Sequence, residues 1–182
     1  SFFLFQRVKR VGKDVRFDNL KFSFSKFLLA WMTQGLWVFI CLFPILVVFS
    51  SPTNNEITYF AFGSLTYLIG LVIEIIADYQ KTIHNKLNNK KRKFISSGLW
   101  SKSRHPNYFG EFLIWTGITI ICFPVFSGFK YLALITPIFI YFLLNYISGV
   151  NLLEERAKEK WGNNPEYVKY LKTTPKFFPK IF

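Results

Sequence analysis

The chain has 182 residues, of which 51% are hydrophobic and 20% aromatic, and it carries a formal charge of +13. This combination is typical of a membrane protein with basic flanks, and it argues against a soluble basic domain that would bind nucleic acid. The sequence has no CxxC, GxGxxG, P-loop or GxSxG motif, so we expect neither a zinc site, a Rossmann domain nor a serine hydrolase.

Four apolar stretches predict an all-α, polytopic bundle of transmembrane helices. They are residues 27–49, 57–77, 108–126 and 129–150. Each is close to the roughly 20 residues that cross a bilayer core. The link between the last two is so short, at Ser127 and Gly128, that they must form a helical hairpin. We treat residues 1–182 as a single membrane domain.

Lys and Arg are distributed asymmetrically about these spans. Seven precede the first span, eight lie between the second and the third, seven follow the fourth, and Lys130 alone lies on the other side. The positive-inside rule therefore places both termini, the loop 78–107 and the tail 151–182 in the cytosol or its equivalent. The basic flanks are expected to face anionic lipid.

The chain opens on a short apolar turn, residues 2–5, followed at once by a basic run. This pattern is typical of a membrane span that ends at the basic interface. We therefore expect further spans upstream, in the same polypeptide or in a partner subunit; an interfacial anchor is the alternative. The loop that follows, residues 11–18, alternates acidic and basic side chains and contains Arg16, and a solvated juxtamembrane loop is the alternative to a functional one.

Two acidic residues near the end of the second span are candidates for function. Glu74 and Asp78 are four residues apart and share one helix face. A carboxylate at mid-bilayer costs about 2.5 kcal/mol or more, so Glu74 must face the bundle, a partner or water. Asp78, with Lys81 three residues later, is the stronger candidate for a binding role.

The segment before the third span, residues 103–111, reads SRHPNYFGE. Pro106 disfavours helix before it, and Asn107 is predicted as the N-cap of the following helix. A helix N-terminus attracts phosphate or carboxylate groups, and the guanidinium of Arg104 adds a rigid fork of donors. Arg104 and the neighbouring His105 are therefore predicted to bind an anion.

Tyr108, Glu111 and Trp115 follow at helical spacing and share one face of the third span. An interfacial aromatic belt explains Tyr108 and Trp115. It does not explain Glu111, which we expect to face a pocket.

The tail is predicted to form two short helices. Residues 152–161 are strongly charged and end at Gly162, and Asn164 with Pro165 begins the second helix. A solvated tail on the membrane surface is one interpretation. Glu155, however, lies directly after the fourth span, where it could reach the polar end of a cofactor.

These motifs together resemble the membrane steroid 5α-reductase-like proteins, over nearly the whole chain. The resemblance rests on residues 103–111 with Trp115, on Asp78-x-Gln80-Lys81, on Gly98-Leu99-Trp100 and on Gly12-x-Asp14-x-Arg16. The core of residues 104–110 is shared with isoprenylcysteine carboxyl methyltransferases and phospholipid methyltransferases.

The resemblance implies an enzyme that uses NADPH to reduce a conjugated carbon–carbon double bond in a steroid or other apolar lipid. The residues it and the local chemistry suggest for the cofactor are Arg16, Asp78, Lys81, Arg104, His105, Asn107, Tyr108, Glu111 and Glu155. No match follows Ser1 for the substrate-polarising glutamate and tyrosine of the steroid enzymes, so no catalytic residue is assigned. The alternatives are an S-adenosylmethionine-dependent methyltransferase acting on a lipid or a prenylated cysteine, and a non-catalytic membrane subunit.

Overall fold

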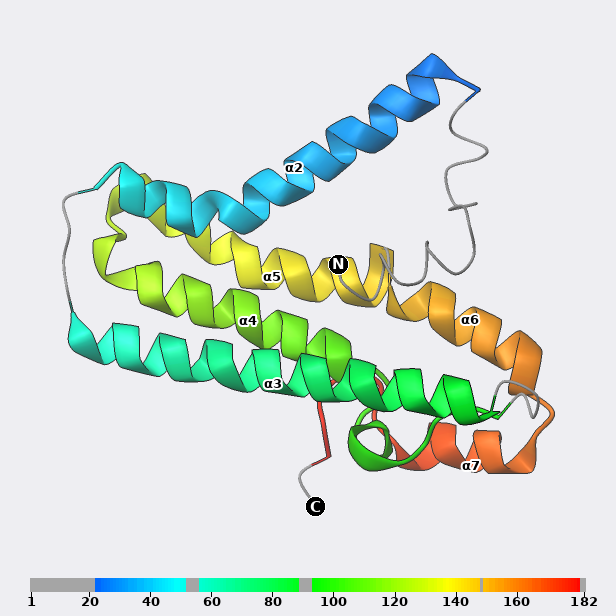
Figure 1. Cartoon of the computed structure of the whole chain (residues 1–182). Helices are drawn as coiled ribbons and strands as arrows, with labels where there is room; N and C mark the ends of the chain where they lie inside the picture. Colours follow the sequence, from blue (N-terminus) through cyan, green and yellow to red (C-terminus); the bar gives the residue numbers. More distant parts are fainter. Residues whose placement is uncertain (1–21, 52–55, 89–92, 148, 181–182) are drawn as a thin grey trace. The chain divides into compact units, whose positions relative to one another are not determined.

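The protein is all-helical over the residues that its computed structural model describes, which are 22–51, 56–88, 93–147 and 149–180 (Figure 1). The chain divides into two compact units, Ser1–Phe39 and Ile40–Phe182. The first unit contributes only residues 22–39 to the described structure, most of them the first part of a helix that ends in the second unit. The predicted all-α fold is confirmed.

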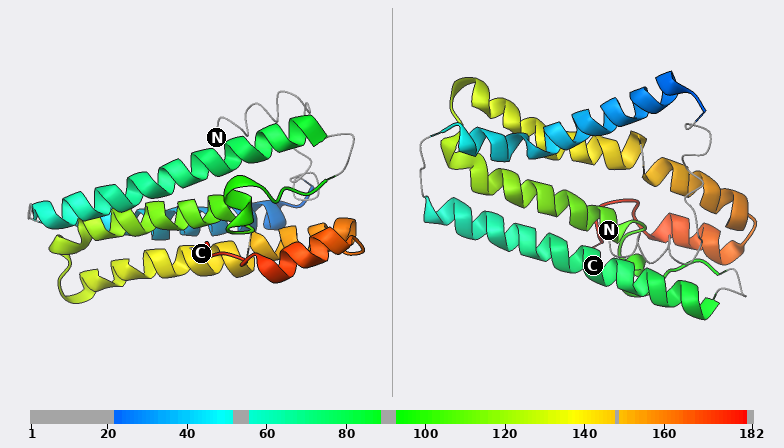
Figure 2. Two further views of the ribbon diagram at one scale, coloured as in Figure 1. Left: turned by 90° about the horizontal axis from the view of Figure 1, so that it is seen from below. Right: turned by 45° about the horizontal axis from the view of Figure 1, so that its top comes forward.

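Six α-helices make up most of the described chain. They are α2 (Phe24–Phe49), α3 (Ile57–Asn88), α4 (Pro106–Cys122), α5 (Ile135–Phe142), α6 (Val150–Trp161) and α7 (Pro165–Thr173). Short 3-10 helices cover Gly98–Ser101, Phe123–Val125 and Gly128–Leu134, and a π-helical turn, Leu143–Ile147, follows α5. In the second unit, α3, α4 and α5 lie side by side, and α6 continues beyond α5 before α7 turns back (Figure 2).

Four of the helical segments are long and apolar enough to cross a membrane, as predicted. Their bounds are Phe24–Phe49, Ile57–Leu87, Pro106–Val125 and Gly128–Trp161. The second is longer than the apolar run suggested, because α3 continues through Asp78 to Asn88. Its 32 residues extend roughly 48 Å, which exceeds a hydrocarbon core of about 30 Å. The start of the segment predicted as a loop is therefore a helix that projects beyond the bilayer.

Glycines bring the backbones of α3 and α4 into direct contact. A Cβ atom added to Gly70 would lie 2.6 Å from the carbonyl oxygen of Gly110, and one added to Gly63 would lie 2.7 Å from that of Gly117. On both helices the two glycines are seven residues apart, so they share one face. Because there is no hydrophobic force between helices in lipid, such close van der Waals packing contributes to their association.

The hairpin between the third and fourth spans is confirmed at Ser127 and Gly128. Gly128 has φ of +51°, a left-handed conformation that glycine adopts without steric cost. Beneath the turn, Val47, Cys122, Phe126 and Ala133 form a buried apolar cluster. This cluster closes one end of the bundle.

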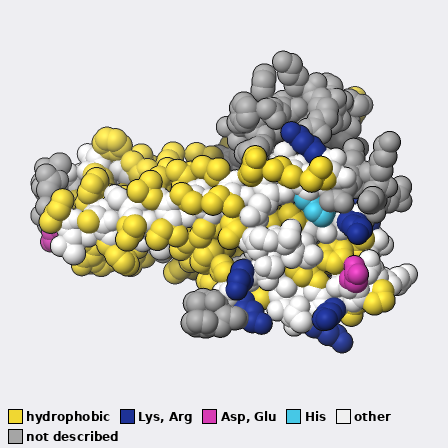
Figure 3. Space-filling model, turned by 60° about the horizontal axis from the view of Figure 1, so that its bottom comes forward, with side chains coloured by type: hydrophobic (Ala, Val, Ile, Leu, Met, Phe, Trp, Pro, Cys, Tyr) yellow, Lys and Arg dark blue, Asp and Glu magenta, His cyan; other side chains and the backbone are white. Residues whose placement is uncertain are grey.

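The opposite end carries the charge. Apolar side chains cover the elongated part of the face shown in Figure 3, whereas the Lys, Arg and His side chains visible on it gather at one end. In the membrane-crossing window of α3 only 17% of residues are buried inside the protein, as expected for a helix that faces lipid. The candidate site lies at the charged end.

Candidate functional site

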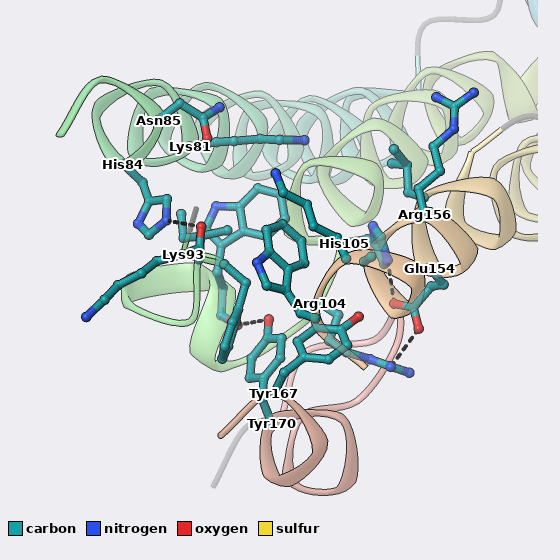
Figure 4. A pocket seen from close by; sticks show the side chains of 17 residues that line it. Lys81, His84, Asn85, Lys93, Arg104, His105, Glu154, Arg156, Tyr167 and Tyr170 are labelled. Atoms are coloured by element: carbon teal, nitrogen blue, oxygen red, sulfur yellow. Dashed lines mark hydrogen bonds and ion pairs between the residues drawn. The ribbon is translucent and has the colours of Figure 1, made fainter. Parts of the chain in front are cut away.

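A cavity of about 320 Å³ opens at the charged end of the bundle, between the end of α3, the segment 93–105, α6 and α7 (Figure 4). Its charged lining is strongly basic. Five cationic residues and one acidic residue contribute to this lining: Lys81, Lys93, Arg104, Arg156 and Lys160, and Glu154. A cavity with this balance of charge suits a polyanionic ligand.

Glu154 joins the two residues that the sequence singled out for anion binding. Its Oε2 lies 2.7 Å from Nη1 of Arg104 and its Oε1 lies 2.9 Å from Nε2 of His105 (Figure 4). All three side chains are at most 15% exposed. The attraction between the carboxylate and the guanidinium therefore offsets the free-energy cost of removing both charges from water. Nε of Arg104 is buried and has no hydrogen-bond partner.

The loop that carries Arg104 is held by the end of the chain. Ser103 is fully buried; its hydroxyl donates to the carbonyl of Phe177 at 2.8 Å and accepts from the amide of His105 at 3.2 Å. The amide of Arg104 donates to the carbonyl of Pro175 at 2.9 Å. The C-terminal segment is therefore part of the framework of the site and is not a free tail on the membrane.

The predicted helix cap differs from the observed one. His105 occupies the N-cap position of α4, without a side-chain capping bond, and Pro106 takes the first helical position, where its missing N–H costs nothing. Asn107 is already inside the helix, where its side chain lies close to Asp78 on α3 and its Oδ1 is buried without a hydrogen-bond partner. Because Pro106 starts the helix one residue before Asn107, Asn107 is not at the N-cap position and the predicted cap does not form.

An aromatic wall lines the other side of the cavity. The ring of Phe94 lies 5.1 Å from that of Tyr167 and 5.4 Å from that of Tyr170, between ring centroids. The hydroxyl of Tyr170 donates to the carbonyl of Trp100 at 2.6 Å, and the ammonium of Lys81 lies 5.2 Å from the centre of the Trp100 ring. Aromatic faces beside cations are suited to a stacked heteroaromatic ring.

A second polar group lies one turn into the membrane helices, between α3 and α4. Glu111 is partly buried there and lies within electrostatic range of Glu74 and Asp78. It therefore faces α3, as its cost in lipid requires. The ring of Tyr108 stacks on that of His105 with centroids 5.8 Å apart and an interplanar angle of 9°. His105 therefore lines the basic cavity on one side and contacts Tyr108, which precedes Glu111 on α4, on the other.

The predicted binding residues divide into three sets. Lys81, Arg104 and His105 line the cavity, and Asp78, Asn107, Tyr108 and Glu111 lie at or next to the interface between α3 and α4. The remaining two do not line this cavity. Glu155 is exposed and lines a neighbouring hollow, which Arg104 and Glu154 also line, and Arg16 lies outside the described residues.

Glu154 and the aromatic wall were missed from the sequence. A signal for Glu154 existed in the helical spacing of α6. Leu153, Ala157 and Trp161 fall on the face that lines the cavity, and Glu154 shares this face, whereas Glu155 points away from it. The periodicity of the apolar residues therefore distinguishes the two glutamates, although their adjacency in sequence does not.

The titration of His105 provides a test of this arrangement. Burial lowers the pKa of His105 below its ordinary value of 6.5, with Glu154 opposing the shift and the charges of Lys81 and Arg104 adding to it. Neutral His105 therefore stabilises the fold above pH 6.5, and this contribution is lost as the pH falls through the lowered pKa. We expect the melting temperature of the detergent-solubilised protein to fall below pH 6.5, and to fall less in His105→Gln. Equal acid sensitivity of the two proteins would contradict the assignment.

Comparisons with known proteins place the chain in a family. Residues 1–174 match the family described as "Protein of unknown function (DUF1295)", and the chain belongs to it. The "Probable 7-dehydrocholesterol reductase" of Acanthamoeba polyphaga mimivirus is 27% identical over 153 residues, which cover 73% of this chain and 32% of that protein. The chain thus spans about a third of the length of this relative. No solved structure matches the chain.

Proposed function

We propose that this chain is the cofactor-binding part of a membrane reductase, which uses NADPH to reduce a conjugated carbon–carbon double bond in a steroid or another lipid. The observation that carries the proposal is the basic cavity in which Glu154 orients Arg104 and His105. The name of the viral relative, a probable sterol reductase, supports the same class of reaction, as does the resemblance of residues 103–111 to steroid 5α-reductase-like proteins.

The donor set of the cavity fits this cofactor. NADPH carries several negative charges on its phosphates, and Arg104, with its unpartnered Nε, can bind a phosphate through a planar fork of donors. Lys81 adds an ammonium group to the same cavity, and His105, whose Nε2 contacts Glu154, lines it beside Arg104. A volume of about 320 Å³ is at the small end of ligand pockets, so we assign the cavity to one nucleotide half of the cofactor.

The nicotinamide would supply the hydride, and the residues of this chain would position it. Phe94, which lines the cavity and is partly exposed, offers an aromatic ring for the adenine. Asp78, Asn107, Tyr108 and Glu111 are placed where they can meet the remainder of the cofactor next to the membrane core. We leave Glu155 out of this set because it is exposed and lies outside the cavity.

Charge also separates the proposal from a methyltransferase. S-adenosylmethionine is cationic overall, and a cavity with five cations and one carboxylate would repel it. A scaffold without activity would bind neither compound. These three functions therefore differ in one measurement, which is the affinity of the purified protein for each cofactor.

We expect the full-length protein, purified in detergent, to bind NADPH saturably. Arg104→Ala is expected to weaken binding about tenfold or more, because a charge-assisted contact contributes about 1.5–3 kcal/mol, and Glu111→Gln to weaken it less. Lys172→Ala is the matched control, since Lys172 is exposed and absent from the cavity lining. Isothermal titration calorimetry would measure all three. Saturable binding of S-adenosylmethionine, or of neither compound, would overturn the proposal.

A further inference from the structure

A second hollow, of about 510 Å³, lies on the other side of Phe94 and Tyr170, which line both spaces. Its charged lining consists of three lysines and one glutamate: Lys102, Lys169, Lys180 and Glu166. Ser96, Ser101, Thr173 and Thr174 also line it. Cations and hydroxyl-bearing residues together suit a phosphate group, and the proposed function makes no use of them.

The framework of this hollow is fixed by contacts within the chain. The amide of Lys180 donates to the carbonyl of Lys102 at 2.8 Å, which holds two of the lysines beside each other. Tyr170 bridges from α7 to the carbonyl of Trp100 at 2.6 Å, and Thr174 is buried. Three segments that are distant in sequence therefore present their lysines at one place before any ligand binds.

The hollow lies close to the start of the third membrane-crossing helix. Lys102 comes four residues before Pro106, where the third membrane-crossing helix begins. Phe178 stacks on Tyr141 of α5, with ring centroids 5.9 Å apart, and remains 53% exposed. An exposed ring against a membrane helix faces the acyl region, and Lys180 follows it by two residues. This order of aromatic and basic residues is typical of the bilayer interface.

We propose that Lys102, Lys169 and Lys180 bind the phosphate headgroup of an anionic lipid, with Phe178 beside its acyl chains. Lipid phosphate is the most concentrated anion at this depth, and each cation near an anionic surface contributes to such binding. Glu166 lies on the same lining and can pair with an amino group, which favours phosphatidylserine among the anionic lipids. The site shares Phe94 and Tyr170 with the cofactor cavity, but its three lysines take no part in the proposed function.

The test compares two variants with the same loss of charge. In the site variant, Lys102, Lys169 and Lys180 are replaced by Gln; in the control variant, the exposed residues Lys86, Lys158 and Lys172 are replaced by Gln. Native mass spectrometry of the full-length protein would count bound phosphatidylserine during a titration. We expect affinity for phosphatidylserine to fall at least tenfold in the site variant and to stay near wild type in the control, while phosphatidylcholine binds all three proteins alike.

Equal losses in the two variants would show an effect of net charge only and would overturn the proposal. So would a wild-type protein that binds inorganic phosphate at this site and releases phosphatidylserine in exchange, because the ligand would then be a free anion. Absence of saturable phosphatidylserine binding would overturn it as well. Melting temperatures of the variants establish that they are folded, and NADPH affinity measured on the same samples reports on the proposed function separately.

Discussion

Gly117→Leu is expected to destabilise the protein more than any other single change considered in the membrane region. A Cβ at this position would lie 2.6 Å from the amide nitrogen of Tyr67 and 2.7 Å from the carbonyl oxygen of Gly63. Both are backbone atoms, so no side-chain rotation can relieve the clash, and α3 must move away from α4. We expect the free energy of unfolding to fall by about 3 kcal/mol or more, measured by thermal denaturation in detergent.

Gly35→Leu is the matched control for this prediction. Gly35 also lies in a membrane-crossing helix, but a Cβ there meets nothing within 4 Å. The added Cβ has no close neighbour, and we expect the melting temperature to change little. Similar losses in Gly117→Leu and Gly35→Leu would mean that the effect comes from glycine in a membrane helix in general and not from the contact between α3 and α4.

The glycine contact marks what the sequence could and could not predict about the fold. The apolar stretches predicted four membrane helices and the hairpin at Gly128, because burial in lipid imposes a minimum length and a composition on each helix separately. The pairing of Gly63 with Gly117 and of Gly70 with Gly110 depends on two helices at once. Nothing in either helix alone identifies its partner, so this contact was not predicted.

In the candidate site, too, the sequence predicted individual residues but not the contacts between them. Arg104, His105 and Glu111 could be identified from the local sequence. A basic loop at a helix N-terminus favours an anion, and a carboxylate inside a membrane helix costs free energy unless it faces a pocket or a partner. Glu154 and Ser103 owe their roles to partners 50 and 74 residues away. Asn107 was expected to cap its own helix and instead lies inside it, close to Asp78 on α3. Local patterns identified the residues, and only the tertiary structure assigned their partners.

Glu154→Ala is expected to be the most damaging change within the candidate site. It leaves the guanidinium of Arg104 and the ring of His105 without the carboxylate that lies 2.7 and 2.9 Å from them. Breaking a fully buried ion pair costs about 3–5 kcal/mol. Because these side chains keep up to 15% exposure, we expect a smaller loss, about 2–3 kcal/mol, in the free energy of unfolding.

The neighbouring glutamate makes this prediction specific. Glu155 is on the same helix and carries the same charge, but its side chain is exposed. Glu155→Ala is therefore expected to change stability by less than about 0.5 kcal/mol. Both variants remove one negative charge from α6, so a shared effect of net charge would appear equally in both. Equal losses in the free energy of unfolding for Glu154→Ala and Glu155→Ala, measured by thermal denaturation, would contradict the prediction. Glu154 would then not be the residue that stabilises Arg104 and His105.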